Sequence, residues 1–467
     1  MKKVLLLSPP YVKDYMRNAR CDFVSNSGSQ WYPIWLGYCG AFLEQQGYQV
    51  RFVDGPASGI DFAQTEQIFS DFRPDLLLIY SGQLSEESDC QLADRLLTLH
   101  PCEAIFVGPF FSINPEQTLG KSQRMRYGVT GEFEYPVLEF LRGDDPATIA
   151  NFVVKGEEGA VARVAERPYL DGQALDAFPF VSDFFQRHLD LRWYRTPSEK
   201  FPYIDMMSGR GCVWGQCTYC LWVFSFIKGH TYNLRSIENL VDEVAFIEKQ
   251  MPQVKSLMIQ DDTFPSGRAR EFAEEKLRRN LKLPWSCYSR GNIDYEVLQL
   301  MKQSGCLNLH VGFESGNPEI LKNIKKGVDR ERMTRFAHDA KRAGVHLHGD
   351  FAIGFPGESA ETIRQTIDWA CEIRPDTAQF QLMIPFEGTP MYDELKAQGQ
   401  LKNGAPDFPE LNWQEMEAWA KQAYREFYIS WPYAKEVAMH PYDLGVKKFG
   451  TYISAVPSLF WKRWNVR

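Results

Sequence analysis

The feature that most constrains the fold is an alternation of buried, strand-like runs with amphipathic helical runs in the second half of the chain. The strand-like runs are rich in β-branched and aromatic residues, and the segments between them carry apolar residues three or four positions apart. The strand-like runs are Tyr203–Ser208, Lys255–Gln260, Trp285–Ser289, Leu307–Phe313, His346–Gly354 and Ala378–Pro385. This pattern predicts about six parallel strands connected by helices. Such a sheet places its working groups at the carboxyl ends of its strands.

Three of the ten cysteines fall in one short loop directly after the first predicted strand: Cys212, Cys217 and Cys220. Thiolates spaced this closely cannot all pair with one another, but they can supply three of the four protein-side bonds of one iron-sulfur cube. One iron then remains open. The alternative is a structural zinc loop, with His230 as the nearby fourth ligand. Zinc ligands usually occur as two separated pairs, so the spacing favours the cluster.

Four further motifs follow the cysteine loop, in which Tyr219 precedes the third cysteine. They are Gln260–Phe264, Trp285–Arg290, Gly312–Gly316 and Ile353–Glu358. In their order and their places near strand ends, they resemble the radical S-adenosylmethionine (SAM) enzymes, within the branch that has an N-terminal cobalamin-binding domain. The resemblance implies that the open iron chelates SAM and that the reduced cluster cleaves it to a 5'-deoxyadenosyl radical.

The same resemblance implies a set of cofactor-binding residues but identifies no catalytic side chain. The set is Asp261, Asp262, Arg290, Glu314 and Ser315. Asp261 is expected near the methionine ammonium group, and Arg290 and Glu314 at the carboxylate or ribose.

One departure from the family pattern concerns the first two cysteines, which are separated by four residues, Val213–Gln216, where the family has three. Gly215 can adopt backbone angles that other residues resist. We therefore expect a small bulge, which affects the detailed geometry of the cluster site more than the existence of the cluster.

The first third of the chain is a separate α/β unit. Its predicted strands are Val4–Leu7, Val50–Val53, Asp75–Tyr80, Ala104–Val107 and Tyr127–Val129. With helical stretches between them, they predict a doubly wound sheet. Small or turn-forming residues follow the strands and allow a large flat ligand to approach the backbone. The layout resembles the cobalamin domains of the same branch, and the implied binding positions are Ser81, Gly82, Gly108, Pro109, Gly131 and Glu132.

The Asp-x-His-x-x-Gly run, whose histidine ligates cobalt in many cobalamin domains, is absent from this unit. The single histidine here, His100, stands before Pro101 at a helix end and indicates a surface turn. We therefore expect the lower face of cobalamin not to be held by histidine. The alternative is a vestigial or purely structural α/β layer.

These patterns divide the chain into four regions: 1–145, a cobalamin-binding Rossmann-like domain; 146–200, a hairpin and linker; 201–393, a partial (β/α)6 radical SAM barrel; and 394–467, an α-rich C-terminal region. From Trp431 to Arg467 that region mixes aromatic and basic residues, as suits the interface of an anionic membrane. The alternative is that this tail packs across the barrel and closes it.

Composition excludes some classes of function. A net charge of −8 argues against nucleic-acid binding, and no stretch approaches the ~20 apolar residues of a membrane span. Ten cysteines and the absence of a signal peptide indicate the cytoplasm, with peripheral membrane contact through the tail.

Several runs are similar to the hopanoid-biosynthesis members of the branch, which contract the ring of a cyclitol side chain. These runs are Trp31–Leu36, Cys217–Trp222, Asp261–Phe264, Val311–Gly316, Leu321–Gly327 and His348–Phe351. The expected function is thus a rearrangement at an unactivated carbon of an apolar or lipid-linked substrate, with a reducing partner such as flavodoxin or ferredoxin. The alternatives are a cobalamin-dependent radical SAM C-methyltransferase and a non-catalytic iron-sulfur binding module.

Overall fold

The computed structural model describes residues 1–17, 22–25, 28–409 and 411–439. These residues form two compact units. Unit 1 contains Met1–Thr196, Phe201–Gly211 and Leu221–Val254, and unit 2 contains the rest, including the cysteine loop Cys212–Cys220. The division therefore assigns most of 201–254 to unit 1, although the sequence places this stretch in the barrel region. Residues 440–467 of the predicted membrane-binding tail lie outside the described residues.

A seven-stranded sheet in the order β4-β1-β5-β6-β7-β8-β9 forms the centre of unit 1. The five predicted strands are its parallel part: β1 (Lys3–Ser8), β4 (Gln49–Asp54), β5 (Leu76–Tyr80), β6 (Glu103–Val107) and β7 (Tyr127–Val129). The predicted hairpin adds the antiparallel strands β8 (Phe152–Lys155) and β9 (Val161–Arg163). The order of the parallel strands reverses between β1 and β5, which is where doubly wound sheets bind their ligands.

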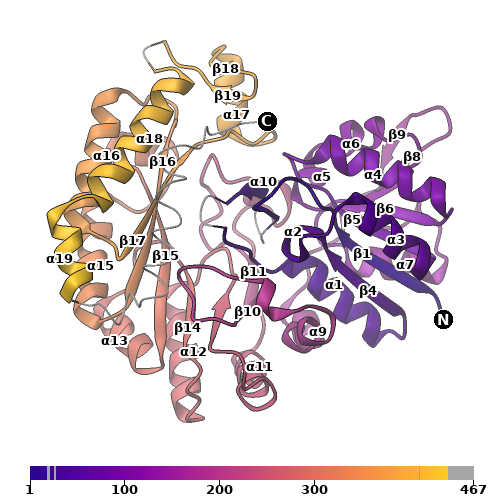
Figure 1. Cartoon of the computed structure of the whole chain (residues 1–467), viewed down its shortest axis with the longest axis horizontal. Coiled ribbons are helices and arrows are strands. Elements are labelled where there is room, and N and C mark those ends of the chain that lie inside the picture. Colours follow the sequence, from indigo (N-terminus) through magenta and orange to yellow (C-terminus); the bar gives the residue numbers. More distant parts are fainter. Residues whose placement is uncertain (18–21, 26–27, 410, 440–467) are drawn as a thin grey trace. The chain divides into compact units, whose positions relative to one another are not determined.

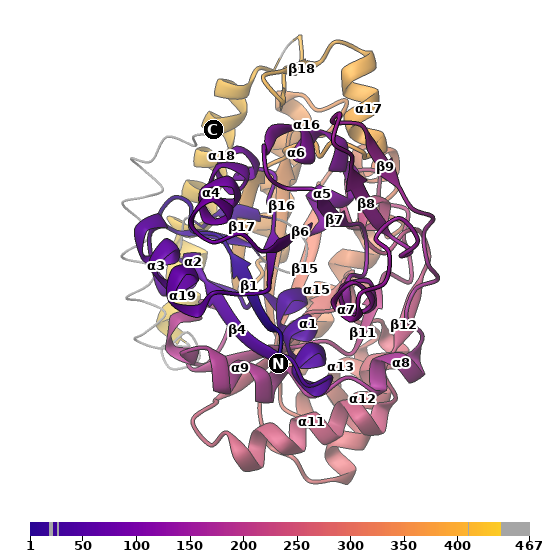
Figure 2. The same ribbon diagram turned by 90° about the vertical axis from the view of Figure 1, so that its right-hand side faces the viewer.

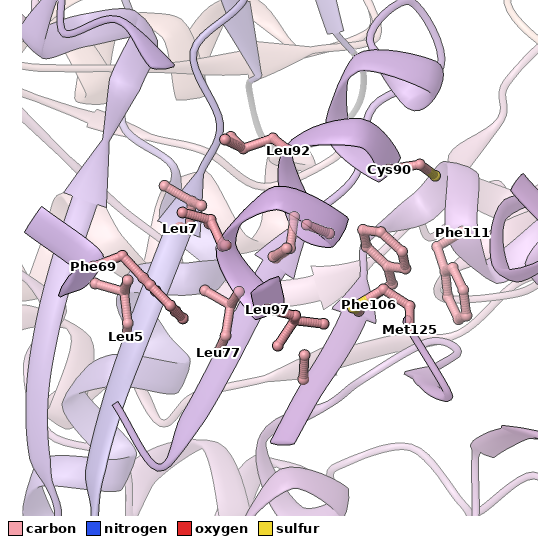
Figure 3. Close-up of a cluster of buried hydrophobic side chains, with 14 of the residues drawn as sticks. Leu5, Leu7, Phe69, Leu77, Cys90, Leu92, Leu97, Phe106, Phe111 and Met125 are labelled. Carbon is pink, nitrogen blue, oxygen red and sulfur yellow. The ribbon is translucent and has the colours of Figure 1, made fainter. Parts of the chain in front are cut away.

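Helices cover both faces of this sheet (Figure 2). One side carries α1 (Ile34–Gln45), α7 (Glu134–Arg142) and α9 (Val181–His188), and the other carries α3 (Phe62–Phe72), α4 (Glu86–Leu99) and α6 (Pro115–Lys121). Leu5 and Leu7 of β1 join a buried cluster with Phe69 of α3 and Leu97 of α4 (Figure 3). Leu6 faces the other way and lies against α1 at Gly40. Because successive strand residues point to opposite faces, the run Val4–Leu7 of β1 is apolar and buried on both sides.

Unit 1 also contains shorter elements that connect the sheet. They are β2 (Tyr15–Arg17), β3 (Asp22–Val24), α2 (Gly55–Ser58), α5 (Pro109–Ile113), α8 (Gly172–Asp176), η1 (Leu191–Trp193), β10 (Tyr203–Met206), β11 (Gly209–Gly211), α10 (Trp222–Ser225), β12 (Tyr232–Leu234) and α11 (Ile237–Gln250).

Within unit 2, parallel strands run in sequence order: β13 (Ser256–Ile259), β14 (Trp285–Ser289), β15 (Cys306–Glu314), β16 (His346–Ile353) and β17 (Thr377–Leu382). Together with β10 they account for the six predicted strands. The connecting helices are α12 (Ser266–Arg278), α13 (Tyr295–Gln303), α14 (Pro318–Asn323), α15 (Arg330–Ala343) and α16 (Ala360–Ile373). They are followed by α17 (Pro390–Ala397), β18 (Leu401–Lys402), β19 (Ala405–Pro406), α18 (Trp413–Tyr428) and α19 (Trp431–Met439).

Helices α15, α16 and α18 lie along one face of the unit 2 sheet (Figure 1). Along each strand, every second side chain packs against the helices that cover this face, which include α12. Trp285 contacts Phe272 of α12, and Phe313 and Phe351 both contact Trp369 of α16. The intervening residues therefore point to the opposite face. Among the described residues, no helix combines the length and apolar character needed to cross a membrane.

Candidate functional site

The cysteine loop of unit 2 is held against the turn after α14 by the segment between its first two cysteines. Gly215 has a φ of +60°, so the longer spacing is accommodated by a left-handed glycine. The indole of Trp214 donates a 2.8 Å hydrogen bond from Nε1 to Lys325 O. The same ring lies beside Gly327, where an added Cβ would come within 2.2 Å of it. Trp214, between the first two cysteines, therefore docks the loop against this turn.

Backbone hydrogen bonds fix the second half of the loop. Thr218 N donates to Ile324 O at 3.1 Å, and Met391 N donates to Thr218 O at 3.1 Å. Cys220 N donates to Cys217 O at 3.2 Å, which closes a tight turn between the last two cysteines. The loop is thus connected to the segments after both α14 and β17.

The three thiols differ in their surroundings. Cys217 is buried, whereas Cys212 and Cys220 are half-buried. Burial raises the pKa of the Cys217 thiol, and the positive charges of Lys326 and Arg290 act in the opposite direction. Nearby cations favour the thiolate that binds metal. Within the described part of the chain, no three Cys, His, Asp or Glu side chains are arranged as ligands of a single metal ion.

Glu314 is directed toward the cysteine loop by a β-bulge. Gly312 pairs with Asp350 on β16, but Glu314 pairs with the next residue, so β15 carries one extra residue at this point. Glu314 has a φ of +63°, a conformation that is uncommon for a residue with a side chain. Its Oε1 accepts hydrogen bonds from Tyr219 Oη at 2.8 Å and from Lys326 Nζ at 2.9 Å.

This Glu314–Lys326 ion pair is buried, with 8% and 7% of the two side chains exposed. Gly312 makes room for it, because a Cβ there would lie 2.2 Å from Glu314 Oε1 and 2.9 Å from Lys326 Nζ. Beside the pair, the Arg290 guanidinium lies 4.9 Å from the centroid of the Trp214 ring and donates to Lys326 O. Glu314 and Arg290, both predicted cofactor residues, therefore meet at the cysteine loop.

The other predicted SAM-site residues occupy nearby strand ends. Asp261 directly follows β13 and is 1% exposed, and Asp262 next to it is half-buried. The Ser315 hydroxyl lies 3.2 Å from the Thr366 hydroxyl of α16 and accepts a hydrogen bond from Asn317 N. Ser315 thus stabilises the turn after β15. The binding roles of all three stay predictions.

A second loop contacts the cysteine loop through an aromatic pair. The ring of Phe355, which follows β16, meets Tyr219 edge-on at 5.3 Å. The backbone N–H groups of Gly354 and Phe355 both donate to Oε2 of Glu358, at 2.5 and 3.3 Å. Glu358 is 6% exposed, and its burial raises the pKa of this carboxyl to about 8. It therefore shapes the loop that supports Tyr219.

In unit 1, a short hairpin formed by β2 and β3 covers the strand ends near the switch point. Arg17 donates to Pro9 O at 2.6 Å and to Asp89 Oδ1 at 2.9 Å. Tyr15 Oη donates to Asp22 Oδ2 at 2.7 Å. A Cβ on Gly82 would lie 2.4 Å from that phenol oxygen, so the predicted binding position Gly82 is covered by the chain itself.

Other predicted cobalamin positions are better placed to meet a ligand. Ser81 is fully buried, and its Oγ has no hydrogen-bond partner among the described residues. Gly108 has a φ of +119°, and a Cβ there would lie 3.0 Å from Ser81 O. Pro109 begins α5, and Gly131 N donates to Ser112 Oγ at 2.9 Å. A buried hydroxyl without a partner at a strand end fits a ligand with polar side groups.

Glu132 has a partner within unit 1. Arg210 donates to Glu132 Oε1 and to Glu134 Oε1, both at 2.6 Å, and its guanidinium lies 4.6 Å from the Trp35 ring centroid. At most 3% of each of these charged side chains is exposed. Arg210 stands two residues before Cys212, so Glu132 anchors the chain that enters the cysteine loop. A cobalamin contact from Glu132 remains a prediction.

His100 ends α4 and lies against Phe69, with the ring centroids 6.1 Å apart. It stands just before β6 begins and thus away from the carboxyl end of that strand. In the described turns that follow β1, β4, β5, β6 and β7, no histidine is present. The described site therefore contains no histidine where one would ligate cobalt.

Sequence reasoning did not select Lys326, Trp214 or Glu358 as parts of the site. Lys326 falls in the run Leu321–Gly327, which carried the family resemblance, but nothing in that run shows that its ammonium group meets Glu314. Trp214 lies in the longer spacing between Cys212 and Cys217, and the signal that could have found it is a large aromatic side chain in a cysteine loop, which buries apolar area and uses its N–H when it packs.

Comparison with known proteins finds a matching superfamily, two relatives and a similar solved structure. Residues 206–370 match the Radical SAM superfamily. An uncharacterized methyltransferase of Pyrococcus horikoshii is 27% identical over 406 residues, which cover 84% of this chain and 82% of that protein. Cytidylyl-2-hydroxyethylphosphonate methyltransferase of Streptomyces wedmorensis is 26% identical over 469 residues, which cover 85% of this chain and 82% of that protein. The structure of the radical SAM methyltransferase TsrM of Kitasatospora setae, with cobalamin and a [4Fe-4S] cluster bound, has a TM-score of 0.65 at 20% identity and covers 85% of this chain and 78% of TsrM.

The chain therefore carries a radical SAM domain, and the predicted α/β fold class and radical SAM enzyme class are confirmed. The superfamily match favours an iron-sulfur cluster over zinc and an enzyme over a non-catalytic module. These relatives do not support the expected hopanoid ring contraction. They are methyltransferases, so they support the C-methyltransferase alternative instead.

Proposed function

We propose that this protein is a cobalamin-dependent radical SAM methyltransferase that acts on a carbon atom of a small molecule. The observation that carries the proposal is the cysteine loop held against the buried Glu314–Lys326 pair at the carboxyl end of β15. The methyltransferase relatives, and the cobalamin and cluster bound by TsrM, support it.

Three residues of the loop would hold the 4Fe-4S cluster: Cys212, Cys217 and Cys220. Lys326 and Arg290 provide positive charge beside Cys217. In the low-dielectric surroundings of a buried thiolate, that charge stabilises the anionic ligand set. When bound, the reduced cluster supplies the electron that cleaves SAM to methionine and a 5'-deoxyadenosyl radical, and methylcobalamin supplies the methyl group.

Glu314 would bind SAM. Tyr219 and Lys326 both donate to its Oε1, and Oε2 accepts no hydrogen bond from the described residues. Oε2 can therefore accept a ribose hydroxyl, while the ion pair fixes the orientation of the carboxylate. Arg290 complements it as a donor for the SAM carboxylate.

In unit 1, cobalamin would lie at the carboxyl ends of β5 and β6. Ser81 would donate its unpartnered hydroxyl to the ligand, and Gly108 would lie beside it, where the chain packs closely on Ser81 O. No histidine stands in these described turns, so cobalt would lack an imidazole ligand from them. A one-electron donor protein such as flavodoxin or ferredoxin would reduce the cluster.

The test is an anaerobic incubation of the reconstituted, cobalamin-loaded protein with S-adenosyl-[methyl-2H3]methionine, a reductant and candidate acceptors, followed by mass spectrometry. Methyl transfer should give S-adenosylhomocysteine together with 5'-deoxyadenosine, because one SAM donates its methyl group and a second one provides the radical. The labelled methyl group should appear in the acceptor.

Cys217→Ala serves as the inactive control for this incubation. An altered, unlabelled acceptor together with 5'-deoxyadenosine but no S-adenosylhomocysteine would show a rearrangement and refute the proposed methyl transfer.

A further inference from the structure

One face of the unit 2 sheet is polar. Barrels built from β/α repeats usually fill their interior with branched apolar side chains. Here most strand residues that face the helices are aromatic or aliphatic, and most of those on the opposite face are hydrophilic, with Met258, Gly312 and Ala352 as the exceptions. The hydrophilic residues of the opposite face are Ser286, Tyr288, Asn308, His310, His348, Asp350, Thr377, Gln379 and Gln381.

Strand register arranges some of these residues into one continuous row. Tyr288 pairs with His310, His310 with His348, and His348 with Thr377. The ring centroids of Tyr288 and His310 are 5.2 Å apart, and those of His310 and His348 are 4.9 Å apart. Gln260 extends the row, because Ile259 before it pairs with Cys287 before Tyr288. We call Gln260, Tyr288, His310, His348 and Thr377 the polar row.

Three side chains on this face carry buried polar atoms without a hydrogen-bond partner among the described residues. They are Gln260 Nε2, Ser286 Oγ and Asn308 Nδ2, on residues 2%, 0% and 5% exposed. Ser286 and Asn308 are register partners, so they lie side by side. Proteins rarely leave buried donors unpaired, and these three need acceptor oxygens.

The face is accessible beside these orphan groups. About a fifth of the His348 side chain (19%) and a quarter of the Asp350 side chain (25%) are exposed. His348 is held in one orientation, since its Nδ1 lies 2.6 Å from Thr377 Oγ1 and its Nε2 lies 3.4 Å from Asp350 Oδ1. A fixed imidazole and a nearby carboxylate can each bind a hydroxyl group of a ligand.

The polar row lies close to the predicted SAM site. On β15 the residues of this face are Asn308, His310 and Gly312, and the Glu314–Lys326 pair lies over Gly312. Two residues along a strand span about 7 Å. A molecule of metabolite size bound at His310 therefore reaches the Glu314 end of the strand.

We infer that the polar row, with Ser286 and Asn308, binds the substrate and selects an oxygen-rich, hydrogen-bonding small molecule. This inference rests on the proposed methyltransferase function and names its substrate class. It differs from the sequence-based expectation of an apolar or lipid-linked substrate, since burying a hydrocarbon against three unpaired donors is unfavourable. Bound acceptor oxygens would instead satisfy those donors.

The experiment supplies the cobalamin-loaded holoenzyme with S-adenosyl-[methyl-2H3]methionine, a reductant, and two extracts of the organism that makes the protein. One extract is made in aqueous methanol and the other in hexane. The wild-type protein should label a compound of the aqueous-methanol extract. Asn308→Leu and His310→Phe should each reduce that labelling about tenfold or more, because each removes hydrogen bonds to the substrate.

Two controls separate substrate binding from folding. Leu309→Met changes the neighbouring residue on the helix-facing side of β15 at nearly constant volume and should label normally. Every variant should keep the absorbance of the cluster, and Leu309→Met should also keep the substrate-independent formation of 5'-deoxyadenosine. Ser286→Ala, the smallest change on the same face, repeats the test if a larger substitution prevents folding.

Each outcome decides a different point. Labelling confined to the hexane extract would overturn the inferred substrate class and leave the methyltransferase function intact. Undiminished labelling by folded Asn308→Leu, His310→Phe and Ser286→Ala would overturn the role of this face. Absence of label from both extracts would refute the proposed function itself, and the inference would fall with it.

Discussion

Replacing Glu358 with Gln should remove a pH-dependent loss of stability from unit 2. The carboxyl group is buried after β16, and its Oε2 accepts hydrogen bonds from Gly354 N and Phe355 N. Its Oε1 has no hydrogen-bond partner among the described residues. Burial raises the pKa of Glu358 to about 8 and outweighs the two N–H donors, which lower it. The folded protein therefore keeps Glu358 protonated at neutral pH.

The sign and size of the effect follow from linkage. In the unfolded chain the pKa of Glu is about 4.3. Because folding raises the pKa of Glu358 to about 8, its protonated carboxyl stabilises the folded state fully below pH ~4. This stabilisation is lost as the pH rises through 8. The complete loss is about 5 kcal/mol, of which about 2 kcal/mol falls between pH 6 and pH 8. At about 2–4 °C per kcal/mol, the wild-type transition should fall by about 4–8 °C over this interval relative to Glu358→Gln.

Gln has the shape of the protonated acid and keeps an acceptor for the two N–H groups, so its stability should not carry this dependence on pH. The assay is anaerobic scanning calorimetry of both proteins at pH 6 and pH 8. Glu361→Gln, an exposed change in the first turn of α16, is the control and should follow the wild type. Equal shifts of wild type and Glu358→Gln, within about 1 °C, would refute the raised pKa and the reasoning from burial.

Three further predictions concern the cofactor sites. Cys217→Ala should abolish 5'-deoxyadenosine formation measured by chromatography, whereas Cys306→Ala, at a fully buried strand position, should not; full activity in Cys217→Ala would exclude the cluster assignment. Gly327→Ala should reduce cluster content measured by iron analysis, because the new methyl group displaces the indole of Trp214 beside the cysteine loop. Gly399 has a similar positive φ but open space around it, so the control Gly399→Ala should retain the cluster. Corrinoid bound to the protein should show a base-off absorption spectrum that is unchanged in His100→Ala, and a histidine-ligated spectrum would contradict the site described in unit 1.

The parallel strands and the cysteine loop were predictable because their signals are local. A strand such as β1 is a continuous apolar run, as a strand buried on both faces must be, and its position follows from residues that are adjacent in sequence. Cys212, Cys217 and Cys220 stand within nine positions of one another, so a single loop contains all three. The freedom of Gly215 is likewise a property of the residue itself, and its φ of +60° agrees with the expected bulge.

The partners of the buried charges depended on tertiary structure. The chain separates Arg210 from Glu132 by 78 positions, and no local pattern reports that the guanidinium bridges Glu132 and Glu134. The predicted ligand-binding role of Glu132 at a strand end stays a prediction, and the structure adds that Glu132 pairs with Arg210 before the cysteines.

What the sequence determined by itself was the class of fold and the chemistry of its cysteine loop, since both depend on the type and spacing of neighbouring residues. Only the tertiary structure decided which groups surround that chemistry. The bulge that directs Glu314 to Lys326, and the register that aligns Tyr288, His310 and His348, arise from pairing between strands. A shift of one residue would reverse the faces of a strand, so the polar surface is set by long-range packing, which short patterns do not encode.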